Sequence, residues 1–460
     1  MVWIASLAHN AGRGNARSPR LLGYKLLLFP ELATKDMKSI LLCAIGFGIS
    51  LSAFAQTISL RHDLEGRALD VLATQVLRFN DEQKGKAKVV LQDLRGVENK
   101  HVLPELALLE PDDSMEFFGS RPRFRPLHEV MREGGQKLDA GQFFPQVADA
   151  VDDAGGRLQA LPLGLSLPVL FVNRAAMRKA GLDPEQPIKT WWELQKVAGE
   201  IYDHGGKCPL TSGRFAWIHS ENVSAQAGEA LTQRQGSTEK VLVNGMVNVK
   251  HLALLASWQK SRYFHYSGPA REGYRRFLSG ECALLTGESS LFAEARRAGI
   301  DVAVQALPHY DDVYAAKPAD VLPDGAGLWV LAGHKKDDYK LIARFVAFLM
   351  RPEIQKDWVK VTSYLPMTPG ALVALRDSDI PPPLLDAAQK RLSVSRKGST
   401  RPKHGPLRDK LHEFLGEEVS FVWNSDRAAK EALDNTVRRV NASLAPAAKT
   451  APPKPGSPVK

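Results

Sequence analysis

Few residues in this sequence have the types and spacing that covalent chemistry needs. The nearest approach to a G-x-S-x-G nucleophile elbow is Gly-Leu-Ser-Leu-Pro at residues 164–168. Its fifth residue is Pro168 rather than glycine, so the tight strand-to-helix turn that exposes a nucleophile is not supported. The sequence contains neither a G-x-x-x-x-G-K-[ST] phosphate loop nor an H-E-x-x-H zinc motif. We therefore expect no catalytic residue, metal or cofactor, and keep a secreted serine hydrolase using Ser166 as a distant alternative.

The cysteines do not indicate a metal site. Cys208 and Cys282 lack the C-x-x-C spacing of a structural zinc site. In an oxidising compartment these two residues could form a disulfide. Two separate buried thiols are equally compatible with the sequence, so the choice stays open at this stage.

The elements that would position a site are clearest at residues 161–194. Two prolines favour extended backbone before them, and the apolar run at 169–172 has the composition of a strand. A short helix is expected at 174–180. Thr190 and Glu193 have the spacing of a capping box, which predicts another helix immediately after Thr190. An extended crossing followed by two short helices is therefore predicted.

The rest of the chain alternates between strand and helix patterns. Residues 58–61 and 87–91 have strand composition, and residues 65–80 between them carry apolar side chains at helical spacing. This order is a β-α-β unit, which implies parallel strands in an α/β layer. The alternation continues to two C-terminal helices, expected at about 407–422 and 428–442. The fold class predicted from the residues is α/β.

Length and composition limit the class of protein. A chain of 460 residues is too long for one ordinary hydrophobic core, which predicts two lobes or domains. The hydrophobic fraction of 44% and the charged fraction of 24% are typical of a soluble globular protein. The formal net charge of +10 comes from basic residues scattered along the chain, so it does not indicate nucleic-acid binding.

The two ends differ from the rest of the sequence. Residues 37–55 combine a basic start, an apolar run and a final Ala-Phe-Ala, which is typical of a cleaved secretory signal peptide. Residues 1–36 do not fit such a signal, so we expect translation to begin at Met37, with an unusually long signal as the alternative. No small-residue lipobox precedes Cys43, so the mature protein should be free and soluble beyond the inner membrane rather than lipid-anchored. Residues 443–460 should form a disordered tail.

The stretch at 161–194 and the string Thr-Ser-Tyr-Leu-Pro at 362–366 resemble segments of the extracytoplasmic solute-binding proteins of ABC importers, above all the branch that binds sn-glycerol-3-phosphate. The similarity extends from about residue 58 to about residue 441. It implies a two-lobed periplasmic binding protein of type II, with a ligand cleft between lobes that hinge strands join. The implied lobes are residues 56–165 with 296–350, and residues 166–295 with 351–442.

The resemblance implies a function without covalent chemistry. The protein would capture glycerol-3-phosphate or a related phosphate-bearing polyol or phosphodiester, and would deliver it to the membrane permease subunits of an ABC importer. It would act as a monomer, without nucleic acid. The main alternative is the same scaffold binding an oligosaccharide or another carbohydrate. A receptor-type protein that has lost its ligand is a further alternative.

Four residues match ligand-binding positions of the family directly. Ser166 falls on a serine whose hydroxyl contacts the ligand phosphate, and Tyr364 falls on a tyrosine whose hydroxyl contacts the ligand. Trp217 falls on a cleft tryptophan, whose flat ring can cover the ligand's carbon backbone. Gly325 falls on a glycine whose backbone amide can approach the ligand. Each also has an ordinary structural interpretation, in a turn or in the packed core.

Other positions of the family pattern are less clearly matched. Ser290 matches a second ligand serine at the start of a predicted helix, but the family pattern is one residue longer there, so Ser289 is a rival. The family clamps the phosphate with an arginine in a C-terminal loop. Aligning the glycine of this loop puts Lys403 at that position, and Arg401 lies two residues before it. Arginine and lysine are not equivalent here, because only the planar guanidinium binds a phosphate bidentately.

The half of the site that would bind the polyol departs further from the family. Arg214 replaces a cleft tryptophan, and Val97-Glu98 stand where the family has a ligand tyrosine. The segment that should carry a ligand glutamate is shortened to about 114–120. The resemblance therefore predicts a partly conserved anion site and an altered polyol site.

Overall fold

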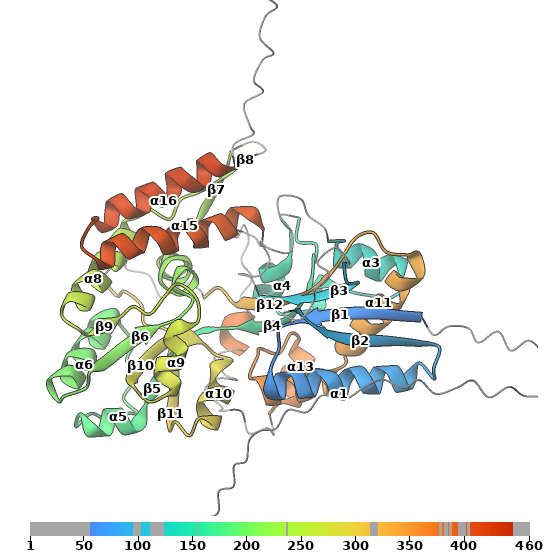
Figure 1. Cartoon of the computed structure of the whole chain (residues 1–460), viewed down its shortest axis with the longest axis horizontal. Coiled ribbons are helices and arrows are strands. Elements are labelled where there is room, and N and C mark those ends of the chain that lie inside the picture. Colours follow the sequence, from blue (N-terminus) through green and yellow to red (C-terminus); the bar gives the residue numbers. More distant parts are fainter. Residues whose placement is uncertain are drawn as a thin grey trace, which may run out of the picture. The chain divides into compact units, whose positions relative to one another are not determined.

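The computed structural model describes residues 56–94, 103–110, 124–153, 155–235, 238–312, 321–376, 389–393 and 405–444, with single positions 380, 385 and 402. The predicted upstream extension and signal peptide lie outside these residues, as does the predicted tail beyond residue 444. Two five-stranded sheets form the framework of the described part (Figure 1). The predicted α/β class is confirmed.

The first sheet consists of β1 (Gln56–His62), β2 (Ala87–Asp93), β3 (Leu106–Leu109), β4 (Leu161–Ser166) and β12 (Asp324–Val330). Its order is β2-β1-β3-β12-β4. The first three strands are parallel, and β12 is antiparallel to both of its neighbours. The predicted β-α-β unit is confirmed, because the helix α1 (Gly66–Glu82) connects β1 to β2 and buries Leu72, Val76 and Phe79.

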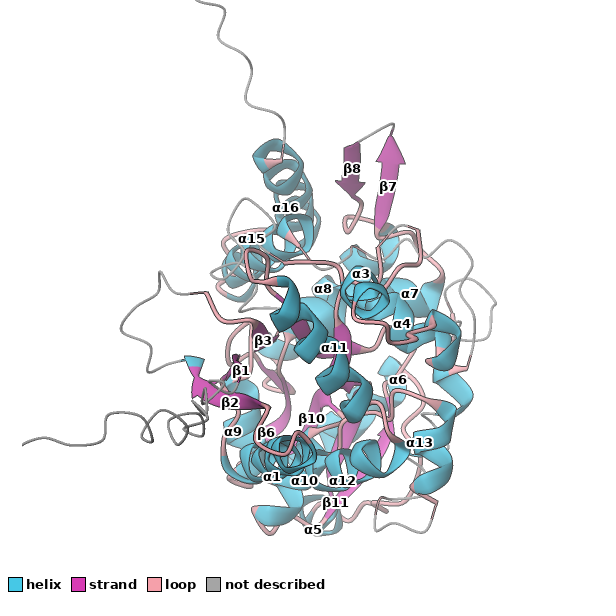
Figure 2. Cartoon of the chain, turned by 90° about the vertical axis from the view of Figure 1, so that its right-hand side faces the viewer, coloured by secondary structure: helices cyan, strands magenta, loops and turns pink. Residues whose placement is uncertain are grey.

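The second sheet consists of β5 (Pro168–Asn173), β6 (Cys208–Ser212), β9 (Phe264–His265), β10 (Cys282–Glu288) and β11 (Val302–Ala306). Its order is β11-β5-β10-β6-β9. β5 is antiparallel to β10 and β11, whereas β6 is parallel to β9 and β10. A separate antiparallel pair, β7 (Thr232–Gln235) and β8 (Thr238–Val241), is visible in Figure 2.

The chain crosses from the first sheet to the second at a single residue. β4 ends at Ser166 and β5 begins at Pro168, so only Leu167 separates the two strands. The Leu167 amide donates to Ser289 Oγ at 3.0 Å, and the Ser289 amide donates to the Leu167 carbonyl oxygen at 2.8 Å. These two bonds hold the crossing against the end of β10. The extended crossing predicted from the prolines is confirmed.

The longer helices are α6 (Trp191–Asp203), α8 (Met246–Lys260), α11 (Lys336–Leu349), α12 (Pro352–Thr362), α15 (Pro406–Trp423) and α16 (Ala429–Ser443). The shorter ones are α3 (Leu127–Glu133), η3 (Ala140–Gln142), α4 (Pro145–Val151), α5 (Arg174–Lys179), η4 (Trp217–Asn222), α7 (Val223–Ala227), α9 (Glu272–Leu278), α10 (Leu291–Arg297) and α13 (Pro369–Ala374). The Thr190–Glu193 capping box begins α6, as predicted. Among the described residues, no helix combines the length and apolarity that crossing a membrane requires.

Sheet membership differs from the predicted lobe ranges in two places. β11 follows residue 296, the predicted return to lobe one, yet it pairs with β5 of the second sheet. α12 follows residue 351, the predicted return to lobe two, yet it packs against α1 beside the first sheet. α15 and α16 pack against each other and against α8, as expected for lobe two. The residue ranges of the lobes stay a prediction.

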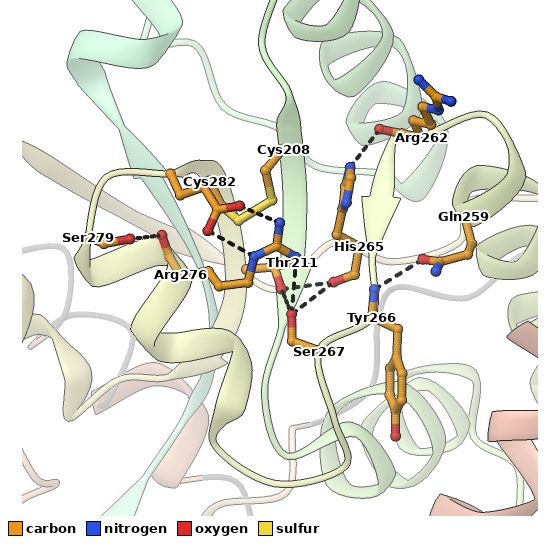
Figure 3. The surroundings of a disulfide bond; sticks show 11 residues. Cys208, Thr211, Gln259, Arg262, His265, Tyr266, Ser267, Arg276, Ser279 and Cys282 are labelled. Carbon is orange, nitrogen blue, oxygen red and sulfur yellow. Dashed lines mark hydrogen bonds and ion pairs between the residues drawn. A yellow bond between two sulfur atoms is a disulfide. The ribbon is translucent and has the colours of Figure 1, made fainter.

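Cys208 and Cys282 form a disulfide, which settles the choice that the sequence left open. The two residues lie opposite each other in the parallel pair of β6 and β10. Figure 3 shows the bond beside Arg276, whose guanidinium donates to Ser267 Oγ at 3.3 Å. The bond therefore joins two neighbouring strands of the second sheet.

Candidate ligand-binding site

The end of β4 brings three of the predicted ligand residues together. In the register of β4 with β12, Ser166 lies opposite Asp324, and Gly325 is the next residue along β12. Tyr364 follows α12, and its ring lies over Gly164, because a Cβ at position 164 would be 3.4 Å from Tyr364 Cζ. Ser166, Gly325 and Tyr364 are therefore grouped around one strand end. Their ligand-binding roles stay a prediction.

The hydroxyl of Ser166 is a buried polar group at this strand end. The side chain is fully buried, and among the described residues its Oγ has no hydrogen-bond partner. An unsatisfied buried hydroxyl costs about 1–3 kcal/mol. A ligand oxygen bound at Ser166 would remove that cost, which agrees with the predicted contact.

Gly325 has a structural reason to be glycine. Its φ of +140° lies in a region that other residues rarely adopt. A Cβ at this position would lie 2.1 Å from the carbonyl oxygen of Gly164 on β4. The close approach of the two strands therefore requires glycine, whether or not the backbone amide also contacts a ligand.

Tyr364 is held rigidly beside β4. Its ring stacks on that of Trp358, with ring centres 5.8 Å apart and planes inclined by 18°, and the Trp358 indole donates to the Leu163 carbonyl oxygen at 2.7 Å. Burial, together with the negative charges of Glu110 and Glu288, raises the pKa of Tyr364 well above its ordinary value. The phenol therefore stays protonated and can donate a hydrogen bond to a ligand.

The structure separates the two rival serines at the start of α10. Ser289 is committed to the crossing, because its hydroxyl accepts from the Leu167 amide. Ser290 is the N-cap residue of α10, but its side chain makes no capping bond. Of the two hydroxyls, that of Ser290 is the one not used in holding the fold. This favours Ser290 over Ser289, and its ligand-binding role stays a prediction.

Trp217 serves the packed core in this structure. Its side chain is fully buried in η4, and its indole N–H donates to the Leu322 carbonyl oxygen at 2.8 Å. The Arg214 guanidinium lies over its ring, 4.6 Å from the centre. The single N–H donor of Trp217 is thus already used, which favours the packing interpretation. Arg401 and Lys403, the two candidates for the phosphate clamp, lie outside the described residues.

Buried arginines instead come from positions that the sequence analysis did not select. Arg408, on α15, donates to both carboxylate oxygens of Glu221 at 2.8 Å each, and to the two oxygens of Asp324 at 3.0 and 2.8 Å. All three side chains are at most 2% exposed. Burial alone would raise the pKa of Glu221, but the charge of Arg408 and a hydrogen bond from His412 lower it to about 2. Glu221 is therefore ionised at neutral pH.

Two more arginines extend this cluster toward β10. Arg214 forms ion pairs with Asp324 and, at 3.2 Å, with Glu288. Arg271 forms an ion pair with the other oxygen of Glu288 at 2.9 Å. We call this set the arginine–carboxylate network; its members are Arg214, Arg271, Arg408, Glu221, Glu288 and Asp324. Its three positive and three negative charges balance.

Glu110 is a carboxylate beside the network that the sequence analysis also missed. It follows the last residue of β3, before the segment in which a ligand glutamate was expected. Burial and the negative charge of Glu288 raise its pKa to about 8, against the opposing charges of Arg214 and Arg271. A protonated carboxyl at neutral pH can both donate and accept a hydrogen bond, which suits a hydroxyl-bearing ligand.

The raised pKa of Glu110 predicts a pH dependence. The folded pKa of about 8 lies above the ordinary value of 4.5, so its stabilising contribution is complete below pH 4.5 and is lost as the pH rises to 8. We expect Glu110→Gln and the unliganded wild type to have the same free energy of unfolding near pH 4.5. At pH 8 the variant should be more stable, by up to about 1.4 kcal/mol for each pH unit above 4.5. Urea denaturation at the two pH values measures the difference.

The exposed Glu353, on α12, provides the control for this experiment. Glu353→Gln should change stability little at either pH. If the free energies of unfolding of Glu110→Gln and the wild type change in parallel with pH, the pKa of Glu110 is not raised. That result would contradict the environment described for this carboxyl.

The sequence did contain signals for these missed residues. Arg408 lies three and seven residues before Leu411 and Leu415, so it occupies the apolar face of a predicted helix. Glu110 directly follows an apolar strand of the parallel part of the first sheet, where ligand residues often gather. Neither signal identifies the partner of the charge, because the partners are distant in sequence.

Comparisons with known proteins found similar sequences and similar folds. The sequence profile of the bacterial extracellular solute-binding proteins matches residues 92–379. The chain is 35% identical over 329 residues to the sn-glycerol-3-phosphate-binding periplasmic protein UgpB of Salmonella paratyphi A, covering 70% of this chain and 75% of that protein. It is 30% identical over 442 residues to UgpB of Brucella abortus, covering 91% of this chain and 100% of that protein.

Solved structures share the fold at lower identity. UgpB from Mycobacterium tuberculosis in complex with glycerophosphocholine superposes with a TM-score of 0.66 at 17% identity, covering 85% of this chain and 98% of that one. Maltose-bound MalE3 from T. maritima gives a TM-score of 0.66 at 15% identity, covering 85% of this chain and 100% of that one. These likenesses confirm the predicted two-lobed binding-protein fold.

Proposed function

The chain belongs to the bacterial extracellular solute-binding proteins, and from this premise we propose that it captures glycerol-3-phosphate or a related phosphate-bearing polyol or phosphodiester for an ABC importer. The ligand class is supported by the names of relatives that are 30–35% identical. The observation that carries the proposal to this chain is the group of Ser166, Gly325 and Tyr364 around one strand end. Among the described residues the buried Ser166 hydroxyl has no hydrogen-bond partner, so a ligand oxygen would complete its bond.

The proposed mechanism is binding and release without a covalent step. A ligand enters between the lobes built on the two sheets. It shifts the protein toward the conformation that binds it more tightly. The ligand is then delivered to the membrane permease subunits. Residues 37–55 act as the cleaved signal that exports the chain, and the Cys208–Cys282 disulfide fits an oxidising compartment. N-terminal sequencing of the exported protein tests the signal, with Gln56 expected as its first residue.

The serine hydrolase alternative loses its structural basis. A nucleophile elbow needs a strand, a tight turn and a helix. Here Ser166 is the last residue of β4, and the chain continues through Leu167 directly into β5. Among the described residues no base lies within hydrogen-bond distance of Ser166 Oγ.

A thermal-shift screen tests the ligand class. The mature protein is heated with glycerol-3-phosphate, glycerophosphodiesters, neutral sugars and oligosaccharides, because a ligand that binds the folded state raises the melting temperature. A shift with phosphate-bearing ligands alone supports the proposal. A shift with neutral sugars alone establishes the carbohydrate alternative, and no shift with any compound points to a protein that has lost its ligand.

Two substitutions test the placement of the site. Ser166→Ala and Tyr364→Phe should each weaken ligand binding about tenfold, because each removes a hydrogen bond worth about 1–2 kcal/mol. Calorimetry on the purified variants, with the ligand found in the screen, measures the affinities. Tyr339→Phe is the matched control, since the Tyr339 hydroxyl donates to the Leu331 carbonyl oxygen and should affect stability alone. Wild-type affinity in both test variants would refute this site.

A further inference from the structure

The carboxylate of Asp324 sits where two arginines converge. Both of its oxygens accept from the Arg408 guanidinium, at 3.0 and 2.8 Å, and one also accepts from Arg214. The Asp324 side chain is fully buried, and those of Arg214 and Arg408 are 4% and 2% exposed. Two planar guanidinium groups directed at one anion are the arrangement that binds a phosphate bidentately. In this chain the anion is a residue of the protein itself.

This position is continuous with the predicted anion site. Asp324 lies directly opposite Ser166 in the antiparallel pair of β12 and β4. Side chains of directly opposed residues project from the same face of a sheet and lie close together. The unpartnered Ser166 hydroxyl and the Asp324 carboxylate are therefore neighbours on one face, and Gly325 adjoins them. The two arginines thus contact an anion beside the very residues expected to hold a ligand phosphate.

The charges in the network determine how readily a phosphate could bind there. The six members of the network comprise three guanidinium groups and three carboxylates, with His412 on Glu221 and Glu294 on Arg271 at its edges. A phosphate dianion placed beside the buried Asp324 carboxylate adds negative charge, which burial makes costly. Without the Asp324 carboxylate this set of six would carry one net positive charge. The Arg214 and Arg408 donors that now bond to Asp324 would lose that acceptor, while Arg408 keeps Glu221 and Arg214 keeps Glu288.

We propose that Asp324 is a specificity-determining residue: its carboxylate occupies an anion subsite formed by Arg214 and Arg408 and weakens the binding of phosphate-bearing ligands there. This inference rests on the proposed function, because it concerns the affinity of the same site for phosphate. It assigns to this chain a lower affinity for inorganic phosphate and phosphate monoesters than the bare arginine pair would have.

The test compares anion binding by the mature wild type and Asp324→Ala, measured by calorimetry with inorganic phosphate and with sn-glycerol-3-phosphate. The variant should bind both probes at least tenfold more tightly than the wild type. A folded variant with unchanged or weaker affinity for both anions overturns the inference. Asp324→Asn keeps the shape while removing the charge, so it is measured as well. Asp324→Asn should bind both anions at least threefold more tightly than the wild type. A folded Asn variant without this gain in affinity also overturns the inference.

Glu418 supplies the matched control, because it is another buried carboxylate between two arginines. Its oxygens accept from Arg439, on α16, and from Arg427, in the loop between α15 and α16. Glu418 itself lies on α15, as Arg408 does. Glu418→Ala should not gain anion affinity. An equal gain there would show that any exposed arginine pair binds phosphate and would overturn the assignment to Asp324.

The outcomes also separate this inference from the proposed function. If the wild type ignores every phosphate-bearing ligand while Asp324→Ala gains phosphate binding, the proposed function fails and the inference is supported. If the wild type binds glycerol-3-phosphate tightly and Asp324→Ala binds it no better, the proposed function is supported and the inference fails.

Discussion

Arg408→Met should destabilise the protein by about 3–5 kcal/mol, because breaking a buried ion pair leaves the opposing charges without compensation. Arg408 makes four hydrogen bonds to Glu221 and Asp324, and both carboxylates are fully buried. Methionine keeps much of the side-chain volume, so the loss reports mainly on charge and hydrogen bonding. Urea denaturation of the unliganded protein at pH 7 measures the change in the free energy of unfolding.

Arg351 gives a control with the same chemistry at the surface. Its guanidinium donates to both oxygens of Glu82, at 2.7 and 2.9 Å, but these side chains are 44% and 43% exposed. Arg351→Met should therefore cost less than about 1 kcal/mol, as for other exposed ion pairs. Equal losses in the two variants would show that the Arg408 pairs are not desolvated as described.

The same variant should change the response to acid. The pKa of Glu221 is lowered to about 2, so its contribution to stability is complete above pH 4.5 and is lost as the pH falls toward 2. That contribution depends on Arg408 and His412. In Arg408→Met the stability should therefore fall less steeply between pH 4.5 and 2 than in the wild type. A triple variant that also carries Glu221→Gln and Asp324→Asn should recover part of the lost stability, since it removes the stranded charges.

Local structure was predictable because its causes lie close together in sequence. The capping box joins Thr190 to Glu193, and the structure contains both of its hydrogen bonds. The alternating apolar patterns placed β1, α1 and β2, and the prolines marked the crossing at Leu167. Each of these features depends on residues that lie close together in the sequence. Sequence spacing is therefore sufficient evidence for them.

The charged part of the candidate site was not predictable in this way. Glu221 and Arg408 are 187 residues apart, and Asp324 and Arg408 are 84 apart, so only the tertiary fold determines their contact. Arg214 was noticed as a departure from the family, but its partners Asp324 and Glu288 were not. A charged residue on the apolar face of a helix indicates that an oppositely charged partner exists, but not which residue that partner is. Conversely, matching to the family selected Ser166 and Tyr364 without any knowledge of distant partners, and their ligand-binding roles stay a prediction.

The pairing of the two cysteines was beyond the sequence for the same reason, and it leads to the second large effect. Cys208 and Cys282 are separated by 74 residues and are joined only because β6 lies beside β10. In the chain-entropy view, a bond closing a loop of this length stabilises a protein by about 4 kcal/mol by restricting the unfolded chain. Reduction of the wild type should therefore lower its free energy of unfolding by about that amount.

A double variant makes this prediction specific. Cys208→Ala combined with Cys282→Ala removes the bond without adding a buried polar group, and both sites are at most 1% exposed. The double variant should be as unstable as the reduced wild type, and reductant should not change it further. Urea denaturation with and without reductant compares the four states.

Ligand affinity should respond differently from stability in this experiment. The disulfide lies at the end of β10 where the strand begins, whereas Glu288 and the serines of the candidate site lie at the opposite end. Ligand should therefore bind the folded double variant with wild-type affinity. The melting temperature of the unliganded variant should nevertheless be lower than that of the unliganded wild type. Two reactive thiols in the oxidised, unfolded wild type would contradict the bond itself. Weakened binding with unchanged stability would instead show that the strand pair positions the site rather than holding the lobe together.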